Sequence, residues 1–175
     1  LELYLRNEDM FIHFRHDVRD KTSLSGDSVC AIHQDAHGNL WIATCSTGLD
    51  RMDVDSGTFT HFTKEDGLPS NVILGIVEDD NGKLWISTND GISCFDPLAG
   101  VFKNYDIGDG LQSDEFGRYA YAKTRDGAIV MGGIDGVNVF QPDQVNDNPY
   151  IPPIVLTGIY QGGEPVNTKG SINNR

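Results

Sequence analysis

The feature that most constrains this chain is an internal repeat with a period of 44 residues. Residues 37–44 read His-Gly-Asn-Leu-Trp-Ile-Ala-Thr, and residues 81–88 read Asn-Gly-Lys-Leu-Trp-Ile-Ser-Thr. Trp41 and Trp85 therefore occupy the same position of the repeat. A period of this length indicates a chain that stacks copies of one supersecondary unit.

Further copies of the repeat follow and precede these two, and their sequences match less closely. In the third copy an Asp-Gly pair at residues 126–127 replaces the Asn-Gly pair at residues 81–82, and Val130 stands at the tryptophan position. An incomplete copy comes before the first, because residues 11–14 match residues 59–62. We therefore expect about four copies, of which the outer ones are incomplete.

Each copy reads as four short strands. In the second copy residues 72–77 are almost continuously apolar, which predicts a strand buried on both faces. Three further strands are expected at residues 84–88, 92–95 and 101–105, and polarity rises toward the last one. In a propeller blade the first strand lines the axis and the last one faces solvent. The sequence therefore predicts an all-β propeller with four antiparallel strands per blade.

The turn between the first two strands carries a hairpin signal of its own. The Asn81-Gly82 pair suits a tight hairpin because both residue types tolerate a positive φ. A β-sandwich is the alternative fold, but it does not explain a repeat that carries the same turn and the same tryptophan. The chain lacks the 3.6-residue period of a helical solenoid.

The repeat resembles that of the two-component regulator propeller family. The resemblance rests on residues 66–72, 79–82 and 84–92, and it covers roughly residues 4–140. Residues 131–142 resemble the closing blade of such propellers. Residues 152–159 resemble the first strand of the triple-tyrosine immunoglobulin-like domain, a small β-sandwich that follows the propeller in that family.

The resemblance implies two domains and a sensory role. Propeller repeats of about 44 residues are expected over residues 1–148, and a linker with the start of the immunoglobulin-like domain over residues 149–175. The family's propellers are periplasmic sensors of membrane-anchored proteins with a histidine kinase output, often joined to a response regulator, or with a diguanylate cyclase output. Their ligands are often oligosaccharides. We accordingly expect a sensor segment without catalysis of its own.

Two functions from other classes remain open at this point. A sugar-active lyase or hydrolase built on a propeller would need a metal or converging carboxylates at the axis, and a scaffold propeller would need neither. The net charge of −13 disfavours nucleic acid as a partner, because phosphates repel an acidic surface. No segment reaches the apolar length of a membrane span.

The chain is expected to be an internal piece of a longer protein. It begins at Leu1 and stops in a polar stretch that ends at Arg175. Three intact blades do not ordinarily close a ring, so open strand edges are expected to pair with a second copy. A stable monomer in light scattering would contradict this expectation.

The three cysteines, Cys30, Cys45 and Cys94, are too few for a disulfide scaffold. Cys30 and Cys45 come to lie opposite each other if the hairpin turns at His37-Gly38. Disulfides between directly opposed residues of neighbouring strands are strained and uncommon, so buried free thiols are predicted instead.

Catalytic, metal and cofactor sites are not expected. His13 and His16 are three residues apart and would point to opposite faces of a strand. His13 and His61 share a repeat position with Asn104, which favours a solvent-facing structural role. The aspartate-rich turn at residues 53–57 lacks the later ligands of a calcium loop.

The tryptophans are expected to pack within blades rather than to stack on sugars. One segment, residues 113–121, breaks the pattern of the apolar first strand. Polar and aromatic groups at the axial mouth of a propeller are where a ligand would be held. Ordinary drift of a closing blade is the competing explanation. The binding candidates in this segment are Glu115, Arg118, Tyr119 and Tyr121.

Overall fold

The computed structural model describes residues 1–145, 160–161 and 164–165. The chain forms two compact units, Leu1–Val145 and Asn146–Arg175. In the second unit a short antiparallel pair joins β14 (Tyr160–Gln161) to β15 (Glu164–Pro165). The expected start of an immunoglobulin-like domain at residues 152–159, and the expected boundary after residue 148, lie outside the described residues.

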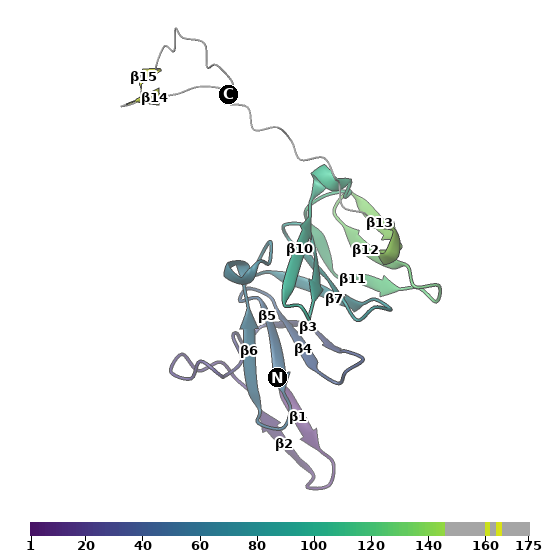
Figure 1. Cartoon of the computed structure of the whole chain (residues 1–175). Coiled ribbons are helices and arrows are strands. Elements are labelled where there is room, and N and C mark those ends of the chain that lie inside the picture. Colours follow the sequence, from purple (N-terminus) through teal and green to yellow (C-terminus); the bar gives the residue numbers. More distant parts are fainter. Residues whose placement is uncertain (146–159, 162–163, 166–175) are drawn as a thin grey trace. The chain divides into compact units, whose positions relative to one another are not determined.

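The first unit is a series of antiparallel sheets whose strands follow chain order (Figure 1). An N-terminal hairpin pairs β1 (Glu2–Leu5) with β2 (Met10–His13). We call the three sheets that follow blades 1, 2 and 3. Blade 1 consists of β3 (Val29–Gln34), β4 (Leu40–Thr44), β5 (Leu49–Asp53) and β6 (Thr58–Phe62). Blade 2 consists of β7 (Ile73–Glu78), β8 (Leu84–Thr88), β9 (Ile92–Asp96) and β10 (Val101–Tyr105). Blade 3 consists of β11 (Phe116–Lys123), β12 (Ile129–Gly133) and β13 (Gly136–Phe140).

The predicted four-strand blade is confirmed. In blade 2 the second and fourth strands have the predicted bounds, and the first and third differ by one residue. Burial falls across the blade as expected: β7 is buried almost throughout, whereas β10 is mostly half-exposed. Short 3₁₀ turns follow the outer or last strand of each blade, at η1 (Lys64–Asp66), η2 (Ile107–Asp109) and η3 (Pro142–Gln144). No helix in the described part of the chain is long and apolar enough to cross a bilayer.

The turn at the Asn-Gly pair differs from the prediction. Only Gly82 has a positive φ, of 78°, and the Gly82 N–H donates to the Asp79 carbonyl. Asp79 Oδ1 also accepts from the backbone N–H groups of Asn81 and Lys83. The turn is therefore held by the aspartate side chain, which removes the need for a positive φ at Asn81.

Successive blades meet along their first strands and are tied by backbone hydrogen bonds. β7 contacts both β3 and β11. The Gly48 N–H of blade 1 donates to the Asn71 carbonyl before β7, and the Gly91 N–H of blade 2 donates to the Asp114 carbonyl before β11. Gly91 has a φ of 91°, and a Cβ there would collide with the Tyr105 carbonyl oxygen. Glycine is thus required at position 91, where blade 2 is hydrogen-bonded to the segment that leads into blade 3.

Two apolar cores fill the spaces between the blades. The core between blades 1 and 2 contains Trp41, Leu49, Ile76 and Phe95. The core between blades 2 and 3 is built around Trp85, with Ile92, Ile129 and Met131. Burial of apolar side chains on both faces of blade 2 explains why this blade carries the most continuous apolar pattern in the sequence.

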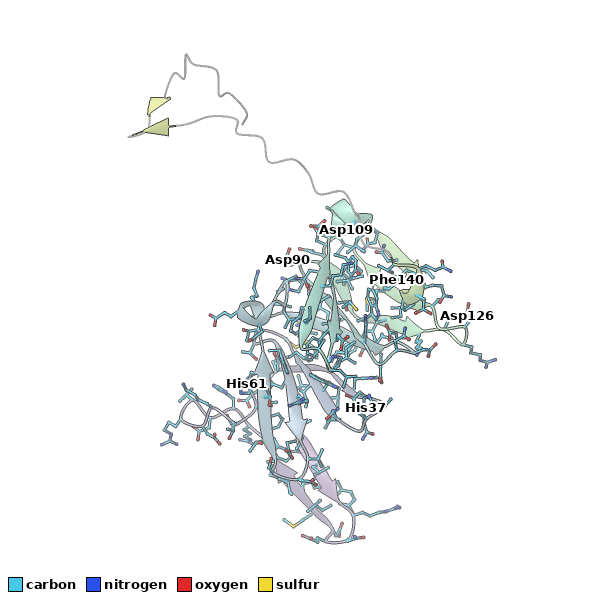
Figure 2. The ribbon with its side chains drawn as sticks, in the orientation of Figure 1. His37, His61, Asp90, Asp109, Asp126 and Phe140 are labelled. Atoms are coloured by element: carbon cyan, nitrogen blue, oxygen red, sulfur yellow. A yellow bond between two sulfur atoms is a disulfide. The ribbon has the colours of Figure 1, made fainter. Side chains whose placement is uncertain are left out.

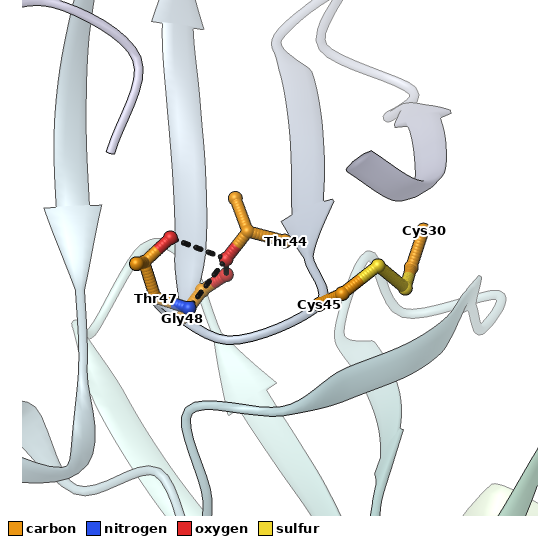
Figure 3. The surroundings of a disulfide bond; sticks show 5 residues. All are labelled: Cys30, Thr44, Cys45, Thr47 and Gly48. Carbon is orange, nitrogen blue, oxygen red and sulfur yellow. Dashed lines mark hydrogen bonds between the residues drawn. A yellow bond between two sulfur atoms is a disulfide. The ribbon is translucent and has the colours of Figure 1, made fainter. Parts of the chain in front are cut away.

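The prediction of free thiols at Cys30 and Cys45 is wrong, because the two residues form a disulfide with a Cα–Cα distance of 5.4 Å (Figure 3). The physical reason is a β-bulge. Val29 pairs with Thr44 and Ala31 pairs with Ala43, so Cys30 is the extra residue of its strand. Cys45 follows the end of β4, and its N–H donates to the Ser28 carbonyl. The bulge removes Cys30 from a regular opposed pair, the arrangement on which the prediction rested.

Candidate functional site

The first strand of blade 3, β11, carries a large irregularity. Phe116 pairs with Gly133 and Tyr121 pairs with Met131, so four residues of β11 stand opposite a single residue of β12. The four residues between these pairs have no Cα partner in β12, and Arg118, Tyr119 and Ala120 are exposed. The same position of the repeat holds the single-residue bulges of β3 and β7. All three blades therefore have an irregularity at this position of the first strand, and the one in blade 3 is the largest.

Small residues make this enlarged bulge fit. A Cβ at Gly133 would meet the Glu115 carbonyl and the Gln112 side chain, and a Cβ at Gly132 would lie 3.2 Å from the Cβ of Ala120. Gly117 approaches the same alanine. Glycine on both strands lets the backbone of the bulge approach the sheet closely.

Tyr119 stands at the tip of the bulge in a strained conformation. Its φ is 61°, one of two positive values among the non-glycine residues described, and its side chain is 76% exposed. The left-handed region is unfavourable for an aromatic residue, and such outliers gather at functional sites. Glu115 and Arg118 are also exposed on this strand or just before it. Three of the four predicted binding candidates are therefore exposed, within five residues of one another in the chain.

Tyr121, the fourth candidate, is placed differently. Its ring packs against the first strand of blade 2, where a Cβ at Gly75 would collide with it. It contacts both interblade cores and is half-buried. Tyr121 therefore acts as a packing residue between β7 and β11, and the ring face that covers Gly75 is closed to a ligand.

The repeated tryptophans are buried as packing residues of the two cores, as predicted. Trp41 is 0% exposed and Trp85 is 3% exposed. Each indole Nε1–H donates to a buried aspartate of the preceding turn, Trp41 to Asp35 at 2.8 Å and Trp85 to Asp79 at 2.9 Å. This aspartate–tryptophan pair was missed by sequence reasoning, although its constant spacing of six residues was visible in both copies.

The carboxyl group of Asp35 shows how strongly the turn is held. Burial by itself raises the pKa of Asp35, but hydrogen bonds from the Trp41 indole, the Asn39 side chain and two backbone N–H groups outweigh it, so the pKa is lowered. Asp35 thus remains ionised as the acceptor of its turn. The buried Cys94 thiol has its pKa raised to about 11 by desolvation, which makes it a poor nucleophile.

The histidines have structural contacts. His61 bridges two elements, with Nδ1 2.8 Å from Asp50 Oδ1 and Nε2 2.9 Å from the Lys21 carbonyl oxygen. His61 is half-buried because it links the outer strand to the preceding segment, whereas His13 and Asn104 at the same repeat position are exposed as predicted. Exposed His13 contacts Glu2 at 2.9 Å. In residues 1–145 and the two short strands beyond, no group of three or more His, Cys, Asp or Glu side chains is arranged to hold a metal ion.

Comparison with known proteins identifies the repeat. The family model of the two component regulator propeller matches residues 23–46 and 67–90, which cover the start of blades 1 and 2. Histidine kinase P4 of Formosa agariphila is 32% identical over 94 residues, which is 54% of this chain and 7% of the kinase. This chain therefore spans a small part of that protein.

Solved structures share the fold. The extracellular domains of two B. thetaiotaomicron proteins described as hybrid two component systems, BT3049 and BT4673, both superpose with a TM-score of 0.68. Their sequence identities are 23% and 22%. The similarity covers 80% of this chain and 19% of the first domain, and 82% and 20% in the second case. The prediction of propeller blades is thus confirmed by comparison as well as by the sheets themselves.

Proposed function

We propose that this chain, which carries two-component regulator propeller repeats, is part of the extracytoplasmic sensor of a bacterial membrane signalling protein. The observation that carries the proposal is the coincidence of two matched repeats with blades 1 and 2, together with the similarity to a histidine kinase. The matched repeat and the fold shared with the extracellular domains of two hybrid two component systems support a sensory role.

The disulfide supports a location outside the cytoplasm. Disulfides persist in oxidising compartments such as the periplasm, whereas the cytoplasm keeps thiols reduced. Cys30 and Cys45 stand at repeat positions that Leu74 and Asn89 fill in blade 2, so the fold itself does not require a disulfide there. We therefore propose that the chain lies in the periplasm, as part of a membrane-anchored sensor.

The exposed segment of β11 is the proposed ligand-binding surface. It offers a cation at Arg118 and an aromatic face at Tyr119, and Glu115 supplies a carboxylate just before the strand. Aromatic stacking combined with charged hydrogen-bonding groups suits an oligosaccharide, whose rings present an apolar face and many hydroxyl groups. The strained backbone at Tyr119 holds its side chain out from the sheet, which favours a role in contact over a role in packing.

Binding is tested by thermal unfolding in the presence of oligosaccharide pools released from xylan, pectin, alginate and starch. A ligand at about 100 times its Kd stabilises the folded state by about 2.7 kcal/mol, which is readily seen as a rise in Tm. We expect one pool to raise the Tm, and Arg118→Ala to abolish the rise. Arg125→Ala is the matched control, because Arg125 is exposed in the β11–β12 turn. Equal rises for both variants, or no rise with any pool, would contradict a saccharide site at β11.

The output is tested by reading the gene beyond Arg175. An immunoglobulin-like domain, a transmembrane helix and a kinase with a response regulator would support the two-component sensor. A cyclase in the same place would make the chain the sensor of a diguanylate cyclase. A stop codon or a secreted catalytic module would contradict membrane signalling and favour a scaffold or a sugar-active enzyme.

A further inference from the structure

The connection that leads into blade 1 is longer than its counterpart in the next copy of the repeat. Nine residues stand between Phe14 and Leu24, whereas five stand at the same place between Phe62 and Leu68. We call residues 15–23 the entry loop, and Figure 1 shows it beside β6. Because Leu24 is fully buried, the extra residues lie outside the core and need contacts of their own.

The entry loop is folded by its own side chains. Asp17 Oδ1 accepts from the Arg19 N–H at 2.9 Å. Asp20 Oδ1 accepts from the Thr22 N–H at 2.9 Å and from the Thr22 hydroxyl at 2.7 Å. The Ser23 N–H donates to the Asp20 carbonyl at 3.1 Å. The loop is therefore a compact turn that blade 1 can hold or release as a unit.

Two residues of the outer strand β6 hold this turn against blade 1. The Phe59 N–H donates to the Thr22 carbonyl at 2.8 Å, near the end of the loop. His61, labelled in Figure 2, has its Nε2 2.9 Å from the Lys21 carbonyl oxygen. In the described part of the chain this is the one hydrogen bond between residues 15–21 and the strands of blade 1. The position of residues 15–21 therefore depends on His61.

Both ring nitrogens of His61 face hydrogen-bond acceptors. Nδ1 lies 2.8 Å from Oδ1 of Asp50, its direct partner in β5, and Nε2 faces the Lys21 carbonyl. Asp50 is fully buried, and its Oδ2 accepts from the Ser25 N–H at 2.8 Å. Either both ring nitrogens carry a proton, or the Asp50 carboxyl group carries one. In both cases the pair holds one proton more than a neutral imidazole beside a carboxylate.

The equivalent pair in blade 2 makes the same link without such a proton. The Ser93 hydroxyl donates to Asn104 Oδ1 at 2.7 Å, and the Asn104 amide donates to the Gly67 carbonyl at 2.8 Å. An amide supplies one acceptor and one donor, so no titratable group is needed. In the N-terminal hairpin the pair is Glu2 and His13, which is exposed. Among these three links, that of blade 1 is both buried and titratable.

The surroundings of His61 contain few other charged groups. A cavity of about 350 Å³ separates the entry loop from blade 1, and His61 lines it together with the titratable loop residues His16, Asp17, Asp20 and Lys21. The Asp17 and Asp20 carboxylates accept hydrogen bonds within the loop, and His16 Nδ1 lies 2.9 Å from the carbonyl that follows the loop, at position 24. From the neighbouring strand β5, Asp50 is the charged group in contact with the ring.

We propose that Asp50 and His61 form a pH-sensitive switch that closes the entry loop over this cavity. When the pair loses its proton to solvent, a ring nitrogen without hydrogen faces an acceptor at Asp50 or at Lys21. The buried pair also gains an unbalanced negative charge, which is unfavourable.

The sign of the pH effect follows from the proton count. The closed loop binds one proton more than the released loop does at alkaline pH, so raising the pH favours release. Imidazoles change charge between about pH 5 and 8, so the loop is closed at mildly acidic pH and released at mildly alkaline pH. This switch is separate from the β11 surface and does not rest on the proposed sensory function.

Trypsin tests the release directly, because it cleaves after Lys21 at the same carbonyl group that His61 contacts. The rate in the full chain is divided by the rate in a free peptide of residues 15–25 at the same pH. We expect this ratio to be at least fivefold higher at about pH 8.5 than at about pH 6.5. The corresponding ratio at exposed Arg125 should stay unchanged. A ratio at Lys21 that is constant or falls with pH would overturn the proposal.

A double variant with amides in place of the titratable pair removes the expected pH dependence. In Asp50→Asn, His61→Asn the first amide can accept from the Ser25 N–H, as Asn138 accepts from a backbone N–H in blade 3. The second can donate to the Lys21 carbonyl, as its equivalent does in blade 2. We expect a cleavage ratio that is independent of pH. A rise as large as that of the unmodified chain would refute the assignment to this pair.

His33→Asn is the matched control. His33 is half-buried and also contacts a carboxylate, with Nε2 3.1 Å from Glu78, but through one ring nitrogen. The variant is expected to keep the full rise in cleavage at Lys21. Loss of the rise would show that removal of any buried imidazole has the same effect, and would contradict the proposal.

Nuclear magnetic resonance of the unmodified chain keeps the proposal testable if the double variant does not fold. The His61 ring nitrogens and the Asp50 carboxyl carbon together report how many protons the pair holds. We expect two protons at about pH 5.5 and one at about pH 8.5. The same number at both pH values would overturn the proposal.

Discussion

The first strands of blades 2 and 3 occupy the same position of the repeat but differ in what covers them. β7 is buried at five of its six residues, whereas β11 has Phe116 as its only fully buried residue. β7 has a one-residue bulge, whereas β11 has a larger irregularity at the same place, with four residues opposite one and a strained tyrosine among them. Blade 2 is therefore packed on both faces, and blade 3 exposes the residues that we propose to contact a ligand. The first strand of the repeat can therefore serve either as a buried packing element, as in β7, or as an exposed surface, as in β11.

The largest expected effect compares equivalent aromatic residues of the two blades. Phe95→Ala is expected to lower the free energy of unfolding by about 3–5 kcal/mol, because Phe95 is fully buried against Trp41, Phe62 and Phe102. Phe140→Ala is expected to cost roughly half as much, since Phe140 is half-buried beside an open groove. Urea unfolding of both variants measures the difference. Equal losses would break the comparison.

The next effect concerns the turn that precedes the second strand of each blade. Asp79→Ala leaves the buried Trp85 indole N–H without an acceptor and removes two bonds to the turn, so a loss of roughly 2–3 kcal/mol is expected. Thr124 holds this place in blade 3 and donates to the Ala128 carbonyl at 3.1 Å. Thr124→Ala is expected to cost less than about 1 kcal/mol. Urea unfolding of both variants measures these losses. A loss of unfolding free energy in Thr124→Ala as large as that in Asp79→Ala would contradict the special role of Asp79 in its turn.

A smaller effect tests the contact between the two strands. Gly75→Ala is expected to destabilise the chain by about 1–3 kcal/mol, because the new methyl group collides with the Tyr121 ring. In a Tyr121→Ala background the same substitution should cost much less. A double-mutant cycle measures this coupling. Additive losses would mean that Tyr121 does not pack on Gly75, and would free its ring for a ligand.

The smallest effect tests the strain at the tip of the bulge. Tyr119→Gly is expected to raise the free energy of unfolding by up to about 1 kcal/mol, because glycine adopts a positive φ without steric cost. Tyr119→Ala keeps the strained backbone and serves as the control without this gain. A loss of stability in Tyr119→Gly would show that the ring makes packing contacts instead of standing free.

The repeat made the blades predictable, because period, turn residues and apolar pattern all point to the same four strands. What sequence reasoning missed depends on local departures from that regularity. The Cys30–Cys45 disulfide requires the bulge in β3, which one extra residue creates and no composition signal marks. The burial of Tyr121 depends on the missing side chain of Gly75, a residue of another blade. The positive φ of Tyr119 follows from a register shift that periodicity alone does not reveal.

Hydrogen exchange of the backbone amides, with and without an oligosaccharide pool that raises the Tm, tests the proposed role of β11 against that of β7. We expect strong protection in β7 and rapid exchange at residues 117–120 in the free chain, and slower exchange at residues 117–120 when the saccharide is bound. Protection of residues 117–120 as strong as that of β7 in the free chain would contradict the proposal that β11 carries the ligand-binding surface. A saccharide that slows exchange elsewhere and leaves this segment unchanged would contradict it as well.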